Sequence, residues 1–445
     1  MSEKARTEPA RGMRDFLPEE IRRREYVISI VKRIYERYGF EPLETPAVEN
    51  IETLLGKYGE EGNQLIFKIL KRGEHEASGQ ADLALRYDLT VPLARVVAHH
   101  QAKLPRLFKR YQIQPVWRAD RPARGRYREF YQCDVDALGS TSPAVEAELC
   151  VAVSDVLTEL GFSDFVIRIN HRQLLTAMLS AAGVPDASHA DALVAIDKLD
   201  KIGRDGVARE LEGRGITPAA REALIACFDA HGDALERTEG FVGVDESGRV
   251  AIDNLRTVLR LCSGTSAEGH LQFDASLARG LSYYTGAIME INVPDLAGSI
   301  GAGGRYDNLV GMFLSQSIPA CGFSLGLERI LVVMGERNMF PASLATTPAD
   351  VMVSCFDADG LAAALQVAAR LRTSGLRVLV YPDADKIGKQ IKYADSRGIP
   401  FVALLGADEI ATGTITVKDL ARQTQSTYDH AEAGAAIRKA LTERG

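Results

Sequence analysis

A chain of 445 residues with a formal net charge of −7 is long enough for two or three domains that each bury a core. The acidic excess argues against bulk attraction to nucleic acid, so a polyanionic partner must meet local basic patches. The N-terminus has no apolar signal segment and no apolar run could span a membrane, so we expect a cytoplasmic protein with no membrane partner. The six cysteines form no CxxC pair and the eight histidines show no ligand spacing, which predicts buried thiols and no structural metal.

The N-terminal part of the chain predicts a helix followed by an extended segment. Apolar and aromatic side chains recur at helical spacing over residues 26–38, and Gly39 ends the pattern. Phe40–Glu49 is expected to be extended, because Pro42 and Pro46 exclude helix and restrict the residues before them. Proline confines such a strand to a sheet edge or an interface.

A second extended stretch, Leu83–Thr90, ends in a charged and hydroxyl cluster just before a helical segment. A buried strand that delivers Arg86, Asp88 and Thr90 at its end is one way to build a site on a rigid scaffold. The same residues also fit a helix start, since Asp88 or Thr90 can cap the helix that follows. The sequence leaves both interpretations open.

The chain is organised around Val116–Ala137, which predicts a strand, an arginine-rich hairpin loop and a returning strand. Five arginines within eleven residues form a donor-dense arm suited to phosphate oxygens. A solvated strand face would explain the polar alternation of the returning strand, whereas the adjoining arginines favour a ligand-binding floor. The residues that share this polar face are Arg128, Phe130, Gln132, Asp134 and Asp136.

The next part of the chain changes from helical to strand-like sequence. Residues 170–264 are helical segments without a cluster of chemistry-bearing side chains, which predicts an inserted helical domain. Strand-like sequence resumes at His270–Asp274 and again at Ala287–Val293. A glycine-rich loop is expected over residues 298–313, and its loose glycine spacing fits turns as well as phosphates. Ala320–Val333 then predicts an apolar strand that leads into a helix.

A linker-like stretch, Pro341–Pro348, precedes a further domain of alternating strands and helices. This alternation predicts a parallel sheet with crossover helices. On its second helix, around Asp385–Arg397, three lysines share one face: Lys386, Lys389 and Lys392. A solvated face explains this stripe, and contact with RNA phosphates is the alternative.

Seven stretches carry a family resemblance: FEPLETPAVE, LRYDLT, RADRPARGRYREFYQCDVD, RGLSYYTG, GGRYD, GFSLGLERI and the C-terminal KIGKQIKYADSRGIPFVALLGADEIATGTITVKDL. Together and in this order they resemble the histidyl-tRNA synthetases, a class II aminoacyl-tRNA synthetase family, along essentially the whole chain. No single stretch is decisive. The joint occurrence is specific, above all RGLSYYTG together with the arginine hairpin.

The resemblance implies an α+β fold: a class II synthetase catalytic domain on an antiparallel sheet, with a helical insertion and a C-terminal α/β anticodon-binding domain. The catalytic domain would comprise residues 1–169 and 265–340, the insertion residues 170–264, and the anticodon-binding domain residues 349–445. Phe40–Glu49 matches the family's dimer motif, so a homodimer is expected.

The implied reaction is ATP-dependent activation of L-histidine to histidyl-adenylate, followed by transfer to histidine tRNA with release of pyrophosphate and AMP. Mg²⁺ is expected with ATP, without a metal cage built by the protein. The catalytic residues would be Arg118 and Arg279, which approach the α-phosphate from two sides. The residues expected to bind histidine are Asp88, Leu89, Thr90, Arg118, Gln132, Asp136, Arg279, Tyr283 and Tyr284. Those expected to bind ATP are Arg118, Asp120, Arg126, Phe130 and Arg329.

The expected roles match the chemistry of the ligand. An ammonium group needs acceptors, which the resemblance assigns to Asp88, Thr90 and Gln132. A neutral imidazole offers one N–H donor and one acceptor, so a carboxylate and a phenol can satisfy both and reject apolar isosteres. The resemblance assigns that task to Asp136 with the two adjacent tyrosines of RGLSYYTG.

Three positions depart from the family's pattern. Ser282 stands in the histidine signature where Asp is expected, and Asp120 stands in the hairpin where Glu is frequent. Ala123 replaces the Gln with which many bacterial members read an extra 5′ guanosine of their tRNA. Reading of that nucleotide is therefore left open.

Two other functions compete with this interpretation. A non-catalytic histidine-sensing or regulatory paralogue would keep the fold as a binding module. The presence of Arg118, Arg279 and Arg329 and a complete C-terminal domain favours the enzyme. A nucleotide-binding enzyme of another α/β class is disfavoured, because the glycine-rich stretch has no GxxxxGK[ST] pattern.

Overall fold

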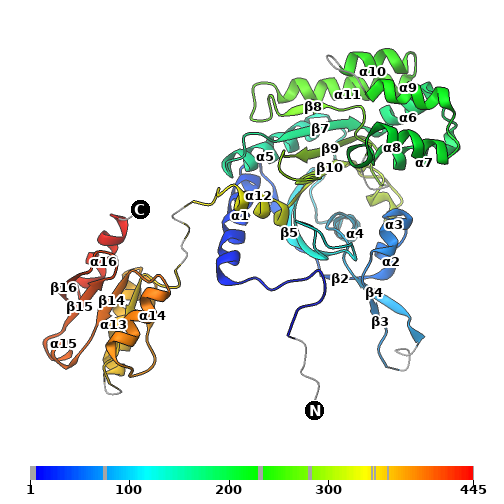
Figure 1. The fold of residues 1–445 in the computed structure, drawn as a ribbon. Helices are drawn as coiled ribbons and strands as arrows, with labels where there is room; N and C mark the ends of the chain where they lie inside the picture. Colours follow the sequence, from blue (N-terminus) through cyan, green and yellow to red (C-terminus); the bar gives the residue numbers. More distant parts are fainter. Residues whose placement is uncertain are drawn as a thin grey trace. The chain divides into compact units, whose positions relative to one another are not determined.

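A computed structural model describes residues 7–73, 78–228, 234–278, 283–341, 344, 347–357 and 360–443. The chain forms two compact units: Met1–Leu17 with Arg23–Met339, and Phe340–Gly445 with Pro18–Arg22 (Figure 1). The finer division into a catalytic domain, a helical insertion and an anticodon-binding domain stays a prediction. Over the described ranges, no helix combines the length and apolar character needed to cross a membrane.

The first unit is built on an eight-stranded sheet with the order β1-β5-β6-β11-β10-β9-β7-β8. The inner strands pair antiparallel, whereas β1 and β8 at the two edges pair parallel with their neighbours. Pro42 lies in edge strand β1, which confirms the expected edge position. In spatial order the strands are β1 (Glu41–Pro42), β5 (Phe108–Trp117), β6 (Glu129–Leu138), β11 (Ala320–Gly326), β10 (Gly301–Arg305), β9 (Ala287–Asn292), β7 (Val166–His171) and β8 (Leu271–Phe273).

The glycine-rich segment predicted as a loop contains an inner strand, β10, so that prediction was wrong over Gly301–Arg305. Its glycines are explained by close packing between β9 and β11. A Cβ on Gly303 would lie 2.3 Å from the carbonyl oxygen of Gly322, and one on Gly304 would lie 2.7 Å from that of Ala287. Neighbouring backbone therefore excludes larger side chains, so these glycines do not signal a flexible loop.

Both faces of the inner sheet are covered. Helices α5 (Ala144–Glu159) and α12 (Leu327–Glu336) pack on β6 and β11. Helix α1 (Pro18–Arg37) brings Tyr35 to the same side, where its hydroxyl reaches the carbonyl of Cys133 at 3.5 Å. The whole of Gln132–Leu138 is buried as a result.

The opposite side carries a smaller sheet and its helices. Strands β2 (Val48–Asn50), β4 (Ala81–Leu85) and β3 (Lys68–Leu70) form an antiparallel sheet in that order. A shared apolar cluster joins these elements to the main sheet and includes Leu54, Leu93, Tyr283 and Tyr306. The helices here are α2 (Ile51–Leu54), α3 (Gly59–Gln64), α4 (Thr90–His100) and the 3₁₀ turn η3 (Val310–Met312).

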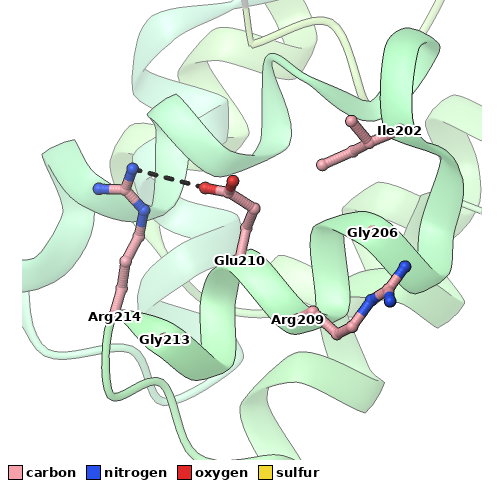
Figure 2. Close-up of a pocket in the computed structure, with 6 residues that line it drawn as sticks. All are labelled: Ile202, Gly206, Arg209, Glu210, Gly213 and Arg214. Atoms are coloured by element: carbon pink, nitrogen blue, oxygen red, sulfur yellow. Dashed lines mark ion pairs between the residues drawn. The ribbon is translucent and has the colours of Figure 1, made fainter.

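Between β7 and β8 the chain forms the predicted run of helices. Its core merges with the main sheet, since Leu175 and Leu179 of α6 share a cluster with Leu277 and Ile288. An open cavity on α8 is lined by Ile202, Gly206, Arg209, Glu210, Gly213 and Arg214, none of which was predicted as a site residue (Figure 2). The helices are α6 (Arg172–Ala181), η2 (Asp186–Ser188), α7 (His189–Ile196), α8 (Leu199–Gly213), α9 (Pro218–Phe228), α10 (Ala234–Val242) and α11 (Glu246–Cys262).

The second unit is an α/β domain with a five-stranded sheet in the order β13-β12-β14-β15-β16. The first three strands are parallel, as the alternation predicted, and β15 and β16 add an antiparallel hairpin that the sequence did not reveal. Its strands are β12 (Val351–Val353), β13 (Val378–Val380), β14 (Phe401–Leu404), β15 (Thr414–Asp419) and β16 (Thr424–Asp429). Its helices are α13 (Leu361–Thr373), α14 (Ile387–Ser396), α15 (Ala407–Thr412) and α16 (Ala433–Thr442).

Candidate functional site

Six polar side chains from β5 and β6 share one face of the sheet, named here the polar floor. Directly paired positions lie on the same face, so each β5 residue stands beside a β6 partner. Asp134 and Asp136 are 2% and 1% exposed, so the interpretation of this face as solvated is wrong. The three cross-strand pairs are Arg110 with Asp136, Gln112 with Asp134, and Gln114 with Gln132.

Asp136 is held from two sides. Its Oδ2 atom lies 2.9 Å from Nη2 of the fully buried Arg110, and its Oδ1 atom accepts a hydrogen bond from the Tyr306 hydroxyl. Burial raises the pKa of the Asp136 carboxyl, and the Arg110 guanidinium opposes that shift. Gly322 on β11 makes the position possible, because a Cβ there would meet Asp136 Oδ1 at 1.9 Å. Asp136 is therefore a fixed, buried acceptor.

Asp88 serves both as a helix cap and as part of the site, so the two interpretations of its cluster are compatible. Its Oδ1 atom accepts from the Val91 amide and the Tyr58 hydroxyl, both at 3.0 Å, and Oδ2 accepts from the Tyr283 hydroxyl at 3.3 Å. Burial raises the pKa of the Asp88 carboxyl, while the Val91 amide and Arg118 oppose this. Thr90, half-buried, begins α4 just beyond.

Arg118 lies at the end of β5, between two aromatic rings. Its Nε atom donates to the Tyr87 carbonyl at 3.0 Å, and its guanidinium carbon is 4.3 Å from the Tyr87 ring centroid and 5.2 Å from that of Phe130. No carboxylate within the described ranges forms an ion pair with Arg118. The geometry leaves its two terminal nitrogens as donors for an anionic ligand.

The arginine hairpin is tied to the rest of the unit at several points. Arg126 pairs with Asp120 at 2.7 Å, and the Arg128 amide donates to the Gly12 carbonyl at 2.8 Å. Arg124 pairs with Glu336 of α12. The N-terminal segment and α12 therefore brace the hairpin from two sides.

Arg329 lies under the hairpin at the start of α12. A Cβ on Gly125, which has φ +67°, would lie 3.2 Å from Arg329 Cγ. The Arg329 Nη1 atom donates to the Ser299 carbonyl. The preceding residue, Glu328, is buried and pairs with Arg24 of α1 at 2.8 Å. Buried neighbours therefore fix the position of Arg329 in the fold.

The histidine-signature residues are described in part. Tyr283 and Tyr284 make an edge-to-face contact, with ring centroids 5.1 Å apart. Tyr283 reaches Asp88, whereas the phenol bonded to Asp136 belongs to Tyr306. Arg279, predicted as catalytic, and Ser282 lie outside the described residues.

The sequence reasoning missed four polar residues of the site: Arg110, Asp134, Tyr306 and Tyr58. Tyr306 stands in the GGRYD stretch that supported the resemblance, so a signal for it was present. Asp134 was placed on the polar face without a role. Arg110 and Tyr58 carried no signal, because their importance depends on strand register and on a contact across the fold.

The arrangement places fixed cations and buried acceptors on the main sheet and on the segments next to it. Arg118 and Arg329 suit anionic groups, whereas Asp88 and Asp136 suit cationic or N–H-bearing groups. Within the described part of the chain, no three His, Cys, Asp or Glu side chains are arranged to hold a metal ion. The site therefore suits a zwitterionic small molecule beside a polyphosphate.

Comparisons with known proteins agree with this geometry. The sequence model of the family described as Histidyl-tRNA synthetase matches residues 12–330, and one described as Anticodon binding domain matches residues 350–440. A histidine--tRNA ligase of Cytophaga hutchinsonii is 42% identical, over 94% of this chain and 97% of the relative. One from Gloeobacter violaceus is also 42% identical, over 96% and 97%. The crystal structure of histidyl-tRNA synthetase from Nostoc sp. PCC 7120 matches with TM-score 0.81 and 32% identity, over 98% of this chain and all of that one.

The close approach of Gly322 to Asp136 predicts a cost for any side chain at this position. Gly322→Ala should lower the free energy of unfolding by about 1–3 kcal/mol, because the added Cβ overlaps a buried carboxylate oxygen. Gly335→Ala on α12 is the matched control: nothing lies within 4 Å of its Cβ, so the helix should gain stability or stay unchanged. Chemical denaturation of both variants measures the difference, and equal stabilities would contradict the packing described.

Proposed function

Because the chain belongs to the histidyl-tRNA synthetase family, we propose how the residues of its first unit carry out the ATP-dependent attachment of histidine to tRNA. The protein is a histidine-specific tRNA ligase. The alternative of a non-catalytic paralogue is not favoured, since relatives named as ligases are about two-fifths identical over nearly the whole chain. The residue roles below are the proposal.

Histidine lies along the polar floor, with its two ends recognised separately. Asp88, Thr90 and Gln132 accept hydrogen bonds from the α-ammonium, and Arg118 holds the carboxylate. Asp136 accepts the imidazole N–H, with Tyr283 and Tyr284 beside the ring. The single observation that carries this assignment is the link made by Arg110, which pairs with Asp136 and donates to the Leu89 carbonyl at 3.2 Å. One buried cation thereby fixes both ends of the amino-acid site.

ATP occupies the space beside the arginine hairpin. Asp120 accepts from the adenine amine, Phe130 stacks on the base, and Arg126 and Arg329 bind the outer phosphates. Arg118 and Arg279 approach the α-phosphate. Mg²⁺ would enter bound to the phosphates of ATP and would neutralise part of their charge.

The chemistry follows from this placement. The histidine carboxylate attacks the α-phosphorus, a mixed anhydride forms, and pyrophosphate leaves. Negative charge builds up on the α-phosphate oxygens in the transition state, and fixed guanidinium groups stabilise it without reorganisation. A hydroxyl of the terminal adenosine of the tRNA then attacks the histidyl carbonyl, the ester forms, and AMP leaves.

The remaining assignments concern the binding partners of the protein and its cellular location. The second unit binds the anticodon arm, as the match to an anticodon-binding family supports. The protein works in the cytoplasm as a homodimer whose interface includes the segment Phe40–Glu49, in which Pro42 marks an edge strand.

Pyrophosphate exchange tests the amino-acid assignment. Each of the twenty amino acids is supplied in turn with ATP and labelled pyrophosphate, and histidine alone should support strong exchange, because Asp136 and Asp88 match its imidazole and ammonium. Comparable exchange with another amino acid would contradict the site described. No exchange with any of them would return the protein to the sensor class.

The lysine stripe on α14 generates a second prediction. Lys386, Lys389 and Lys392 are exposed, and Lys389 pairs with Asp385 at 2.7 Å. If the other two contact RNA phosphates, the double variant Lys386→Gln with Lys392→Gln should weaken tRNA binding. The slope of the logarithm of the tRNA-binding constant against the logarithm of the salt concentration should become less steep by about one unit per lysine. Exchange of pyrophosphate should not change.

The matched control is Arg438→Gln with Lys439→Gln on α16 of the same unit, which removes the same charge from another exposed surface. It should leave charging near normal. If both double variants lost tRNA binding equally, the net charge of the unit, and not the lysine stripe, would determine tRNA binding.

A further inference from the structure

Asp134 occupies the centre of the polar floor, between Gln132 and Asp136 on β6. It is 2% exposed. Directly opposite it stand Gln112 on β5 and Ser324 on β11. The side chain is therefore enclosed by the same strands that build the proposed histidine site.

One oxygen of Asp134 has no hydrogen-bond donor. Within the described ranges, Oδ1 of Asp134 and Oε1 of Gln132 are both buried acceptors without a partner. Gln132 uses its other end to donate to the Ser324 hydroxyl at 3.0 Å. The two acceptors come from positions about 6.6 Å apart on one strand face, close enough for their side chains to converge on one donor-rich group.

Asp88, by contrast, is already well supplied with donors. Its carboxylate accepts three hydrogen bonds, from Val91, Tyr58 and Tyr283. An ammonium group brings three N–H donors and needs three acceptors. Asp134 and Gln132 have two unused acceptors at the centre of the floor. Together with Asp88 and Thr90 at its end, they supply the acceptors that an ammonium group needs.

Within the polar floor, carboxylates outnumber cations. Asp134 and Asp136 are both buried, and Arg110, the cation among the six floor residues, forms an ion pair with Asp136. Burial raises the pKa of Asp134 to about 7, with Arg110 lowering and Asp136 raising it. Other titratable groups that act on or around Asp134 are Asp88, Arg86, Tyr35, Cys133 and Tyr284.

We propose that Asp134 is a further histidine-binding residue, which accepts a hydrogen bond from the α-ammonium beside Gln132 and gives up its proton when histidine binds. This inference rests on the proposed function and adds a residue and a proton to it. The proton leaves to solvent as the ammonium takes its place against the carboxylate, so the charge of the floor together with the ammonium is unchanged, and Arg118 balances the carboxylate of histidine.

The direction of the pH dependence follows. Below about pH 7 the empty site holds the Asp134 proton, and a bound ammonium favours the ionised carboxylate. Histidine binding therefore releases a proton, and its affinity rises as the pH increases through 7. Well above that pH Asp134 is already ionised, and the release disappears.

Calorimetric titration of the full chain with L-histidine at pH 7.0, in phosphate, HEPES and Tris buffers, measures proton release from the dependence of heat on buffer. The unaltered protein should release more protons than Asp134→Asn, because only the unaltered protein has an Asp134 carboxyl whose proton the ammonium displaces. The imidazole of free histidine also titrates close to pH 7, but its contribution to the proton release is the same for both proteins. Asp155→Asn is the control: Asp155 lies on α5, its carboxylate accepts a hydrogen bond from the Tyr38 hydroxyl, and the variant should behave as the unaltered protein.

Kinetics give a second readout. Asp134→Asn should raise the KM for histidine at least tenfold, with a smaller change in kcat and none in the KM for ATP, whereas Asp134→Glu should restore part of the proton release. Equal release by the unaltered protein and Asp134→Asn would overturn the inference. If Asp134→Asn does not fold, a buffer-independent heat in the unaltered protein overturns it equally. Absence of histidine binding in the unaltered protein would overturn the proposed function as well.

Discussion

The site depends on one buried cation, Arg110. It is fully buried, it pairs with Asp136, and it donates to the Leu89 carbonyl between Asp88 and Thr90. Removing one member of such a buried pair costs about 3–5 kcal/mol, since the remaining charge has no counterpart. Arg110 therefore couples Asp136, the residue proposed to bind the imidazole, to the start of α4. The amino-acid site cannot deform at one end without a change at the other.

The nucleotide side is held by a comparable arrangement. Glu328 pairs with Arg24 and also accepts from the Tyr131 amide at 2.9 Å, which joins α1, α12 and β6. The guanidinium of Arg24 lies 4.1 Å from the ring centroid of Phe16, in the N-terminal segment that also meets the hairpin. The arginines proposed to bind phosphate thus rest on a rigid base, as electrostatic stabilisation of a transition state requires.

The sequence predicted much of the fold because local signals were strong. The helix before Gly39, the edge strand at Pro42 and the arginine hairpin each follow from residue chemistry alone. The prediction failed at Gly301–Arg305, where glycine meant close strand packing and not a loop. Local sequence does not show which backbone lies next to a glycine.

The site was predicted less completely, for a related reason. Arg118, Asp88 and Asp136 were identified through motifs; the structure places Asp136 on β6, Arg118 just after β5 and Asp88 just before α4. The role of Arg110 depends on its register opposite Asp136, and that of Tyr58 on a contact 30 residues away in sequence. Such pairings are set by the assembled fold. Sequence motifs therefore reveal the candidate ligand-binding residues more readily than the residues that hold these side chains in position.

The most direct test of this account is a crystal structure of the full chain with L-histidine and a non-hydrolysable ATP analogue. The account predicts an imidazole nitrogen within hydrogen-bond distance of Asp136, the ammonium beside Gln132, and the carboxylate against Arg118. Histidine bound away from the polar floor, with the Asp136 and Arg110 pair untouched by ligand, would contradict it.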